Sequence, residues 1–320
     1  MLETNRSISE PTQNFSEGDI AILPLQIFIT LVGIPGNALV ITIVRKNRPM
    51  RTPTNFLLVN LAVVDLLPLV WLLPSVGLKS LKNPGGTVGS LLCKFITFNT
   101  LPSLTVAASG LTLSVLAVER YNALLKPMRP MFRLTEQTVG YAIGIIWLIC
   151  FSNFLLFAIL VDFDENRRLC MLFICNNCRT TFNAMYATSM IVTLVTILFC
   201  YARIIKGIYF SNTICSAVSN SQEDAKSKRK VVKLLITVTV FYVICQFVPY
   251  MFSVFLDLFS TIKIKGIVLH RFVVTITYFN SSINPFILAF QSSNYKEGFK
   301  NILRKSCLVK LFQGKQVRQV

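Results

Sequence analysis

The sequence predicts an all-α membrane protein, a seven-transmembrane helix bundle followed by a short amphipathic cytoplasmic eighth helix. Only 14% of the 320 residues are charged and 53% are hydrophobic, whereas a soluble domain carries about 25% charged residues. The apolar residues gather in seven blocks, each long enough to cross roughly 30 Å of hydrocarbon as a helix of about 20 residues. Helices are expected because no backbone polar group can stay unpaired in lipid, and the blocks are too uniformly apolar for barrel strands.

The seven blocks divide the chain into three regions. They cover residues 21–44, 55–78, 95–118, 139–161, 184–208, 231–256 and 266–290. An N-terminal tail (1–20) precedes the transmembrane domain (21–290), and the amphipathic helix with a cytoplasmic tail (291–320) follows it. We expect the first block to act as a signal anchor, because it follows a polar stretch and no cleavable signal peptide is evident.

Lysine and arginine orient the blocks. With the N-terminus outside, 21 of the 32 basic residues lie on the inner side and 10 on the outer side. The net charge of +18 is therefore mainly a topology signal and an attraction to anionic membrane lipid. No nucleic-acid partner is expected, because the basic residues border membrane spans and do not line one soluble face. The expected location is the plasma membrane, with sequons at Asn5 and Asn14 glycosylated outside.

Four cysteines lie on the outer, oxidising side of this topology: Cys93, Cys170, Cys175 and Cys178. One disulfide from Cys93 to the loop after the fourth block is expected. The sequence leaves open which of the three loop cysteines closes it. Metal binding by the CxxC pair in the loop is a weaker interpretation, because no second pair or nearby histidine accompanies it.

Asp65 is the only carboxylate at mid-membrane depth, where an ionised side chain costs about 2.5–3.5 kcal/mol to insert. Five polar residues lie at depths from which they could reach it: Asn37, Ser109, Asn280, Ser281 and Asn284. Such a set of hard oxygen ligands suits a hydrated Na⁺ ion or a shared proton. Alternatively, Asn37 and Asn284 hydrogen-bond Asp65 and hold helices together, and one arrangement can do both.

The charged pair Glu119-Arg120 ends the third block and is followed by Tyr121. Cys93 precedes Arg120 by 27 residues, which is about 40 Å of helix and enough to run from one membrane interface to the other. Arg120 is therefore expected at the cytoplasmic mouth of the bundle.

Short motifs occur one per successive block: "GN" (36–37), "LAVVD" (61–65), Cys93, "ERY" (119–121), Trp147, Tyr201 with Ile204, Pro249 and "NP" (284–285). In this order the chain resembles rhodopsin-like, class A G-protein-coupled receptors, most closely their peptide-type members. The segment "NYKEGFKNILRK" resembles the family's amphipathic helix along the inner membrane, with Tyr295 and Phe299 facing lipid. Cys307 would then be a palmitoylation site.

The resemblance implies a receptor and not an enzyme, with an extracellular ligand, a heterotrimeric G protein, arrestin and a receptor kinase as partners. It implies that Glu119 holds Arg120 until activation frees it to contact the G protein, with Tyr201 helping to hold it. The implied coupling and switch residues are Glu119, Arg120, Tyr121, Tyr201, Phe247, Pro249, Asn284 and Pro285. The two prolines would kink the sixth and seventh helices.

The resemblance also implies that Asp65, Ser109, Asn280, Ser281 and Asn284 form a pocket for an allosteric Na⁺ ion that favours the inactive state. No other cofactor is expected.

Several positions depart from the family pattern. Phe247 replaces the tryptophan switch, Leu288 replaces the tyrosine of NPxxY, and Thr193 replaces the fifth-helix proline. We therefore expect the fifth helix to lack its usual bulge. Arg229 replaces an acid at the inner end of the sixth helix, where it would repel Arg120. The interval from Cys93 to Arg120 is two residues longer than usual, in the outer half of the helix.

The loop "LVDFDENRRLCMLFICNNC" carries mixed charge and suits a lid over a peptide ligand, although a plain solvated loop is the alternative. Pro102 stands where amine receptors carry an aspartate, so an amine ligand is not expected. The candidate ligand-binding residues are Asp164, Glu165, Tyr250, His270, Arg271 and Tyr278. Arg271 could instead only extend to water, and a lipid or other small-molecule mediator is the alternative ligand.

Two other classes of membrane protein fit less well. A transporter would show internal repeats and several midplane charges, which the sequence lacks. An intramembrane enzyme would need a nucleophile with a base or a metal cluster, and the single histidine, His270, lies near the outer surface.

Overall fold

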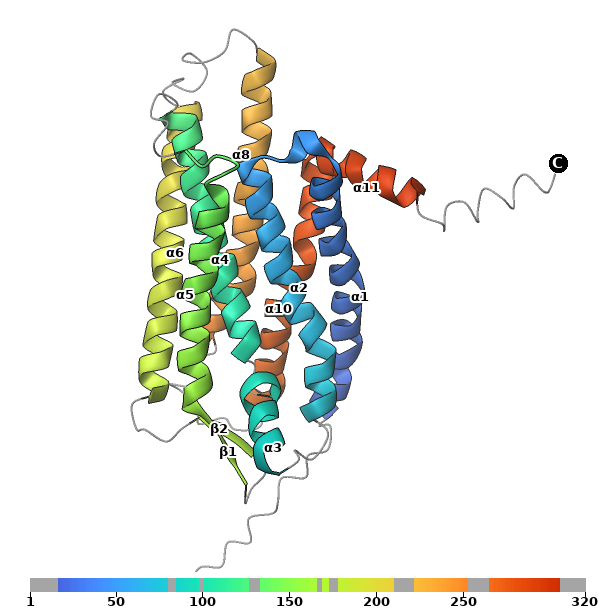
Figure 1. Cartoon of the computed structure of the whole chain (residues 1–320), viewed down its shortest axis with the longest axis vertical. Coiled ribbons are helices and arrows are strands. Elements are labelled where there is room, and N and C mark those ends of the chain that lie inside the picture. Colours follow the sequence, from blue (N-terminus) through green and yellow to red (C-terminus); the bar gives the residue numbers. More distant parts are fainter. Residues whose placement is uncertain are drawn as a thin grey trace, which may run out of the picture.

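The computed structural model describes residues 17–79, 85–97, 100–126, 133–165, 169–172, 178–209, 222–252 and 265–305. Its long helices stand side by side in one bundle (Figure 1). Helix α11 (Ser293–Lys305) extends outward from one end of the bundle, and an antiparallel hairpin of β1 (Val161–Asp164) and β2 (Leu169–Leu172) lies at the other end. We refer to these as the α11 end and the hairpin end.

Each predicted block corresponds to a helical segment of the bundle, which confirms the all-α fold. The long helices are α1 (Glu17–Lys46), α2 (Pro53–Lys79), α4 (Thr100–Leu125), α5 (Val139–Leu160), α6 (Cys178–Tyr209), α8 (Gln222–Tyr242) and α10 (Lys265–Gln291). The 3-10 turn η1 (Arg48–Met50) lies between α1 and α2. Helix α3 (Gly86–Leu92) and the π-helix η2 (Cys93–Thr97) precede α4, and the π-helix η4 (Val243–Phe247) follows α8.

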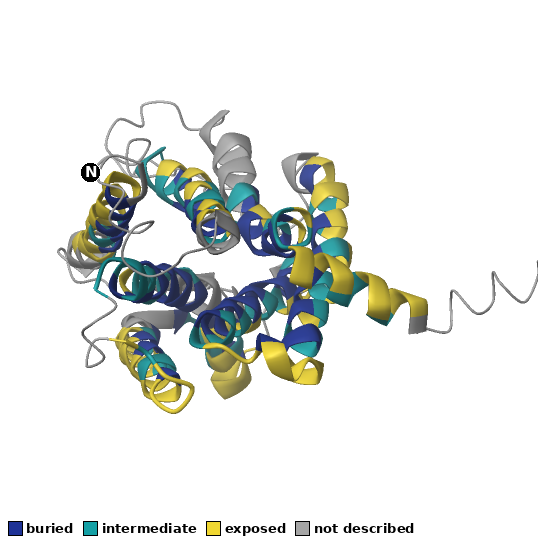
Figure 2. Cartoon of the chain, turned by 90° about the horizontal axis from the view of Figure 1, so that it is seen from above, coloured by how far each residue is buried: buried dark blue, intermediate teal, exposed yellow. Residues whose placement is uncertain are grey.

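The described helices present apolar side chains outward. Within the part of the chain that the structure describes, five stretches are long and apolar enough to cross a membrane: Ile20–Lys46, Pro53–Gly77, Val139–Leu156, Tyr186–Gly207 and Arg229–Phe252. Seen from above, buried residues face the centre of the bundle and exposed residues its rim (Figure 2). The rim includes large hydrophobic side chains such as Leu148 and Ile159, which are 68% and 72% exposed. Lipid solvates such a surface and water does not, so the chain is a multi-pass membrane protein.

Helix α1 approaches α10 closely through two glycines. A Cβ at Gly36 would lie 3.0 Å from the ring of Pro285, and one at Gly33 would also crowd α10. This approach lets Asn37 Nδ2 donate to the carbonyl oxygen of Ser281 at 2.7 Å. That carbonyl is the one that Pro285, four residues later, cannot bond because proline has no N–H. Asn37 therefore satisfies the backbone group that the proline leaves unpaired.

The third span is longer than the predicted 95–118, since the helical segments run from Gly86 in α3 to Leu125 in α4. The apolar pattern ended at Val118, but the helix continues because Glu119 and Arg120 neutralise each other. The π-helix η2 lies in the outer half of this span, where additional residues were expected, and a π turn accommodates an extra residue. Helix α6 is continuous through Thr193, as the missing proline suggested.

The prediction that Tyr295 faces lipid is wrong. Tyr295 is 2% exposed and belongs to the main core, and Phe299 packs against the same core. Gly298 explains this, because a Cβ there would come within 2.6 Å of Ile43 and only glycine allows α11 to lie so close to α1. Tyr295 also donates its hydroxyl to Asn55 Oδ1 at 3.2 Å, which ties α11 to α2.

We expect Asn37→Leu to lower the free energy of unfolding by about 1–3 kcal/mol, the cost of a buried unpaired carbonyl. The measurement is thermal unfolding of the purified protein in detergent. Asn153→Leu is the matched control, because Asn153 is exposed and bonds only the carbonyl of Ile149 in its own helix. Equal melting temperatures for the two variants would contradict the role assigned to Asn37.

Candidate functional site

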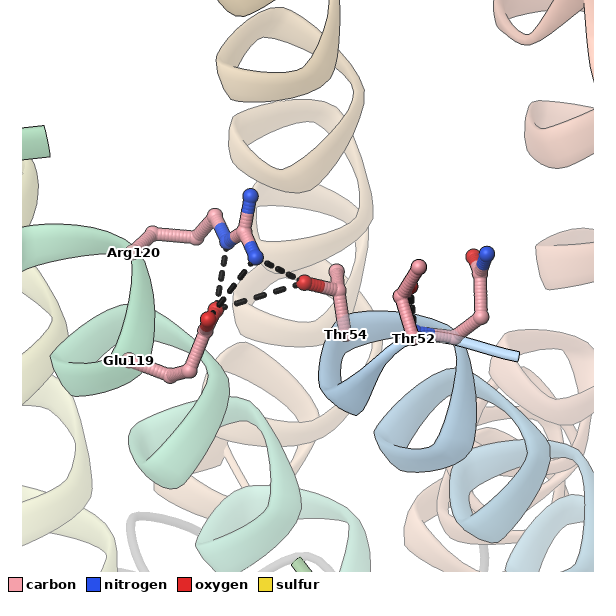
Figure 3. Close-up of polar contacts among 5 residues, drawn as sticks. Thr52, Thr54, Glu119 and Arg120 are labelled. Atoms are coloured by element: carbon pink, nitrogen blue, oxygen red, sulfur yellow. Dashed lines mark hydrogen bonds and ion pairs between the residues drawn. The ribbon is translucent and has the colours of Figure 1, made fainter. Parts of the chain in front are cut away.

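Arg120 is held at the α11 end of the bundle by two side chains (Figure 3). Its Nε donates to Glu119 Oε2 at 2.5 Å, and its Nη2 donates to Glu119 Oε1 at 2.8 Å. Nη2 also donates to the hydroxyl of Thr54 on α2, and that hydroxyl lies 3.3 Å from Glu119 Oε2, to which it donates. Glu119 is 6% exposed and Arg120 20%. Because the ion pair is largely removed from water, it restrains Arg120 more firmly than a surface pair would.

The neighbouring predicted switch residues point elsewhere. The ring of Tyr121 packs against Phe199 on α6 with centroids 6.1 Å apart, and the ammonium of Lys126 lies 5.0 Å from the Tyr121 ring centroid. Tyr201 is 6% exposed, and its hydroxyl lies within hydrogen-bonding reach of the Thr239 hydroxyl on α8. Thr239 is buried as well. The two buried hydroxyls therefore face each other between α6 and α8.

The contacts described for Arg120 anchor it to α2 and to its own helix. Arg229, expected to repel it, is an exposed residue of α8. The restraint on Arg120 therefore does not require an acid on α8, and the replacement of that acid does not leave Arg120 free.

Asp65 lies in a buried polar cluster halfway along α2. It is 1% exposed and accepts a hydrogen bond from Asn284 Nδ2 at 2.7 Å. Ser281 lies beside it, and Ser109 and Asn280 are buried as well. The structure thus buries all five residues of the predicted sodium pocket, and it shows directly the helix-to-helix hydrogen bond of the alternative interpretation.

Four side-chain oxygens of this region are buried without a hydrogen-bond partner in the described residues: Asp65 Oδ1, Asn37 Oδ1, Asn280 Oδ1 and Asn284 Oδ1. Buried polar atoms normally have a partner, so buried acceptors of this kind are candidate ligands for a cation or ordered water. One carboxylate and several amide oxygens are the ligands that a hard cation prefers. The donor set therefore fits Na⁺.

A small cavity adjoins this cluster between α2, α4, η4 and α10. It has room for about one water molecule, and its lining includes Ser109, Ser281, Tyr278 and Gln246. Gln246, in η4, is 4% exposed and donates to the carbonyl oxygen of Thr277 at 3.2 Å. The cavity thus brings two members of the predicted sodium pocket together with Tyr278, a predicted ligand contact.

Tyr242 is the last residue of α8, directly before the π-helix η4. Its side chain fills a notch in α4. Its hydroxyl donates to the carbonyl oxygen of Val106 at 3.4 Å. A Cβ at Gly110 would lie 2.5 Å from that hydroxyl and 3.3 Å from Thr193 on α6. The absence of a side chain at Gly110 therefore lets α4, α6 and α8 meet at one point.

At the hairpin end, Cys93 is buried and disulfide-bonded. Strand β2 contacts η2, the element that begins with Cys93. Of the three loop cysteines, Cys170 lies in β2, Cys178 begins α6 and Cys175 falls outside the described residues. The choice among these three cysteines as the partner of Cys93 stays a prediction.

Some of the predicted ligand-binding residues lie in the hairpin, and the others lie on helices of the bundle. Asp164 ends β1, and Glu165 is exposed in the turn that follows. The ring of Tyr250 packs at a tilt against that of Tyr186 on α6, with ring centroids 4.6 Å apart, and Tyr278 is 5% exposed. His270 and Arg271 belong to α10, but their side chains fall outside the described residues, as do Asn5, Asn14 and Cys307.

Sequence reasoning missed Thr54, Tyr242 and Gly110. Thr54 lies at the start of α2, where its proximity to the third span is purely tertiary. Gly110 did offer a signal, since a glycine within an apolar helix costs about 1 kcal/mol and is kept for a packing reason.

Comparison with known proteins agrees with the motif pattern. A family model described as "7 transmembrane receptor (rhodopsin family)" matches residues 36–288. The chain is 29% identical over 290 residues to neuropeptide FF receptor 2 of Mus musculus, which covers 83% of this chain and 68% of the relative. It is 28% identical over 289 residues to galanin receptor 2b of Danio rerio (88% and 74% covered). It is also 28% identical over 312 residues to somatostatin receptor type 2 of Mus musculus (91% and 78% covered).

Proposed function

Because the chain belongs to the rhodopsin family of seven-transmembrane receptors, we propose that it is a cell-surface receptor that binds an extracellular peptide and activates heterotrimeric G proteins. Members of this family are receptors and not enzymes. The proposal includes an outward N-terminus in the plasma membrane, and arrestin and a receptor kinase as inner partners. The relatives in the comparison are named as receptors for neuropeptide FF, galanin and somatostatin, which supports a peptide ligand.

The restrained Arg120 is the observation that carries the coupling proposal. Glu119 and Thr54 hold the guanidinium of Arg120 by hydrogen bonds. A G protein that binds this end of the bundle can contact Arg120 only in a receptor state in which these hydrogen bonds are broken and replaced by contacts with the G protein. An extracellular ligand favours that state by binding it more tightly, at about 1.4 kcal/mol for each tenfold shift in population.

The function is tested by ligand-stimulated nucleotide exchange. The full chain is reconstituted with G protein and exposed to neuropeptide FF, galanin and somatostatin peptides, and GTP binding is measured. We expect one peptide class to stimulate exchange, and Arg120→Ala to abolish it while ligand affinity stays within about threefold. Arg203→Ala, which removes an exposed cation of α6 packed over Phe199 at 5.7 Å, should keep most of the exchange. Flux of ligand across vesicles without any exchange would instead identify a transporter.

Thr54→Val should raise exchange in the absence of ligand several-fold. The substitution keeps the shape of the side chain but removes the hydroxyl that contacts Arg120 and Glu119. A hydrogen bond to a charged group contributes about 1.5–3 kcal/mol.

Thr52→Val is the matched control for this variant. The hydroxyl of Thr52 accepts a hydrogen bond from the backbone N–H of Asn55 at 3.3 Å and is not bonded to Arg120 (Figure 3). Equal basal exchange in both variants would show that Thr54 does not restrain Arg120.

We further propose that the Asp65 cluster binds Na⁺ and that the ion favours the inactive state. Agonist affinity should then fall as NaCl replaces choline chloride at constant ionic strength, and Asp65→Asn should abolish that dependence. An asparagine at this position can still accept the hydrogen bond from Asn284, so the contact between α2 and α10 persists. Sodium dependence that survives in the variant would leave Asp65 with only its role in holding the two helices together.

A further inference from the structure

The turn between α1 and α2 is densely basic. Within residues 45–51, which we call the basic turn, four side chains are cationic and none is acidic: Arg45, Lys46, Arg48 and Arg51. All four are exposed. A polybasic segment directly after a membrane span is the arrangement that binds anionic lipid headgroups.

Helix α11 adds cations beside the basic turn. Figure 1 shows α11 next to the turn at the same end of the bundle, and Gly298 of α11 lies against Ile43, two residues before Arg45. The exposed charged residues of α11 are Lys296, Glu297, Lys300 and Arg304. The two elements together thus present seven cations and one carboxylate at the depth where the apolar part of α1 ends, which is the depth of lipid headgroups.

The basic turn is fixed in place by a chain of hydrogen bonds. Arg51 Nη2 donates to the carbonyl oxygen of Arg45 at 2.7 Å, which closes the turn. Asn55 Nδ2 donates to the carbonyl oxygen of Met50 at 2.7 Å, and Tyr295 of α11 donates to Asn55 Oδ1. Met50 itself is buried at 3% exposure. A preformed cationic surface loses less conformational freedom when it binds a ligand.

We propose that the basic turn and the exposed cations of α11 bind the headgroup of a polyphosphorylated phosphoinositide in the membrane leaflet at the α11 end. A headgroup with several phosphates matches clustered cations better than a single-charge headgroup does, and arginine binds phosphate oxygens in pairs. The position beside the membrane surface favours a lipid over an acidic face of a soluble protein. This inference does not rest on the proposed signalling function, because it concerns lipid binding by the receptor alone.

The test is a binding titration of the full chain in detergent micelles with fluorescent phosphatidylinositol 4,5-bisphosphate. We expect the double variant Arg45→Gln/Arg48→Gln to bind this lipid at least about tenfold more weakly. The double variant Arg203→Gln/Lys206→Gln removes two exposed cations from α6 near the same end and should bind within about twofold of the parent. Both variants change exposed side chains only, and equal melting temperatures establish that both remain folded.

Three outcomes would overturn the inference. The first is equal weakening in the two variants, since lipid binding would then report total charge and not the basic turn. The second is equal affinity for phosphatidylserine, which carries one net charge. The third is full competition by soluble inositol 1,4,5-trisphosphate at the same concentration, which would identify a site for a free phosphate compound and not for a membrane lipid.

Discussion

The packing of the bundle depends on a backbone carbonyl group of α10 that Pro285 leaves without its usual hydrogen bond within the membrane. Hydrocarbon offers no hydrogen-bond donor, so the carbonyl of Ser281 needs a donor from within the bundle. Asn37 supplies it at 2.7 Å, and Gly33 and Gly36 bring α1 close enough for that bond to form. Pro285 thereby determines that α1 must lie against α10, and that the two helices must approach closely.

Helix α2 is the centre of the polar contacts that follow. Four of its side chains bond other elements at successive depths: Thr54 to Glu119 and Arg120, Asn55 to Tyr295, Asn60 to Thr112 and Trp147, and Asp65 to Asn284. In lipid each such bond replaces an unsatisfied group and holds two helices together. The side formed by α1, α2, α4 and α10 is therefore tightly linked by hydrogen bonds.

The sequence predicts the fold and most of the buried polar positions, because both follow from local rules. Apolar block length gives the spans, and an ionisable residue within a span, such as Asp65, must be buried among partners. The sequence does not predict contacts made by small residues or by polar residues that the pattern places at a helix end. Thr54 reads as an ordinary residue at a helix start, and its hydrogen bond depends on the crossing of α2 and α4. Tyr295 was misplaced because amphipathicity gives the apolar face of a helix but not whether lipid or protein covers it.

Helices α6 and α8 differ from that tightly linked side. The hydroxyls of Tyr201 and Thr239 are buried there and face each other. The described hydrogen bonds of α8 include that of Tyr242 beside Gly110 and that of Thr237 with Gln291 at 3.0 Å, and apolar side chains such as Leu235 pack in the main core. The π-helix η4 lies directly after Tyr242, and single π turns within α-helices are frequent at functional sites. Among the hydrogen bonds described, a displacement of α2 would therefore break more than a displacement of α8 would. The hydroxyl of Thr54 that contacts Arg120 thus belongs to a helix that several hydrogen bonds hold to its neighbours, and those bonds fix the position from which Thr54 restrains Arg120.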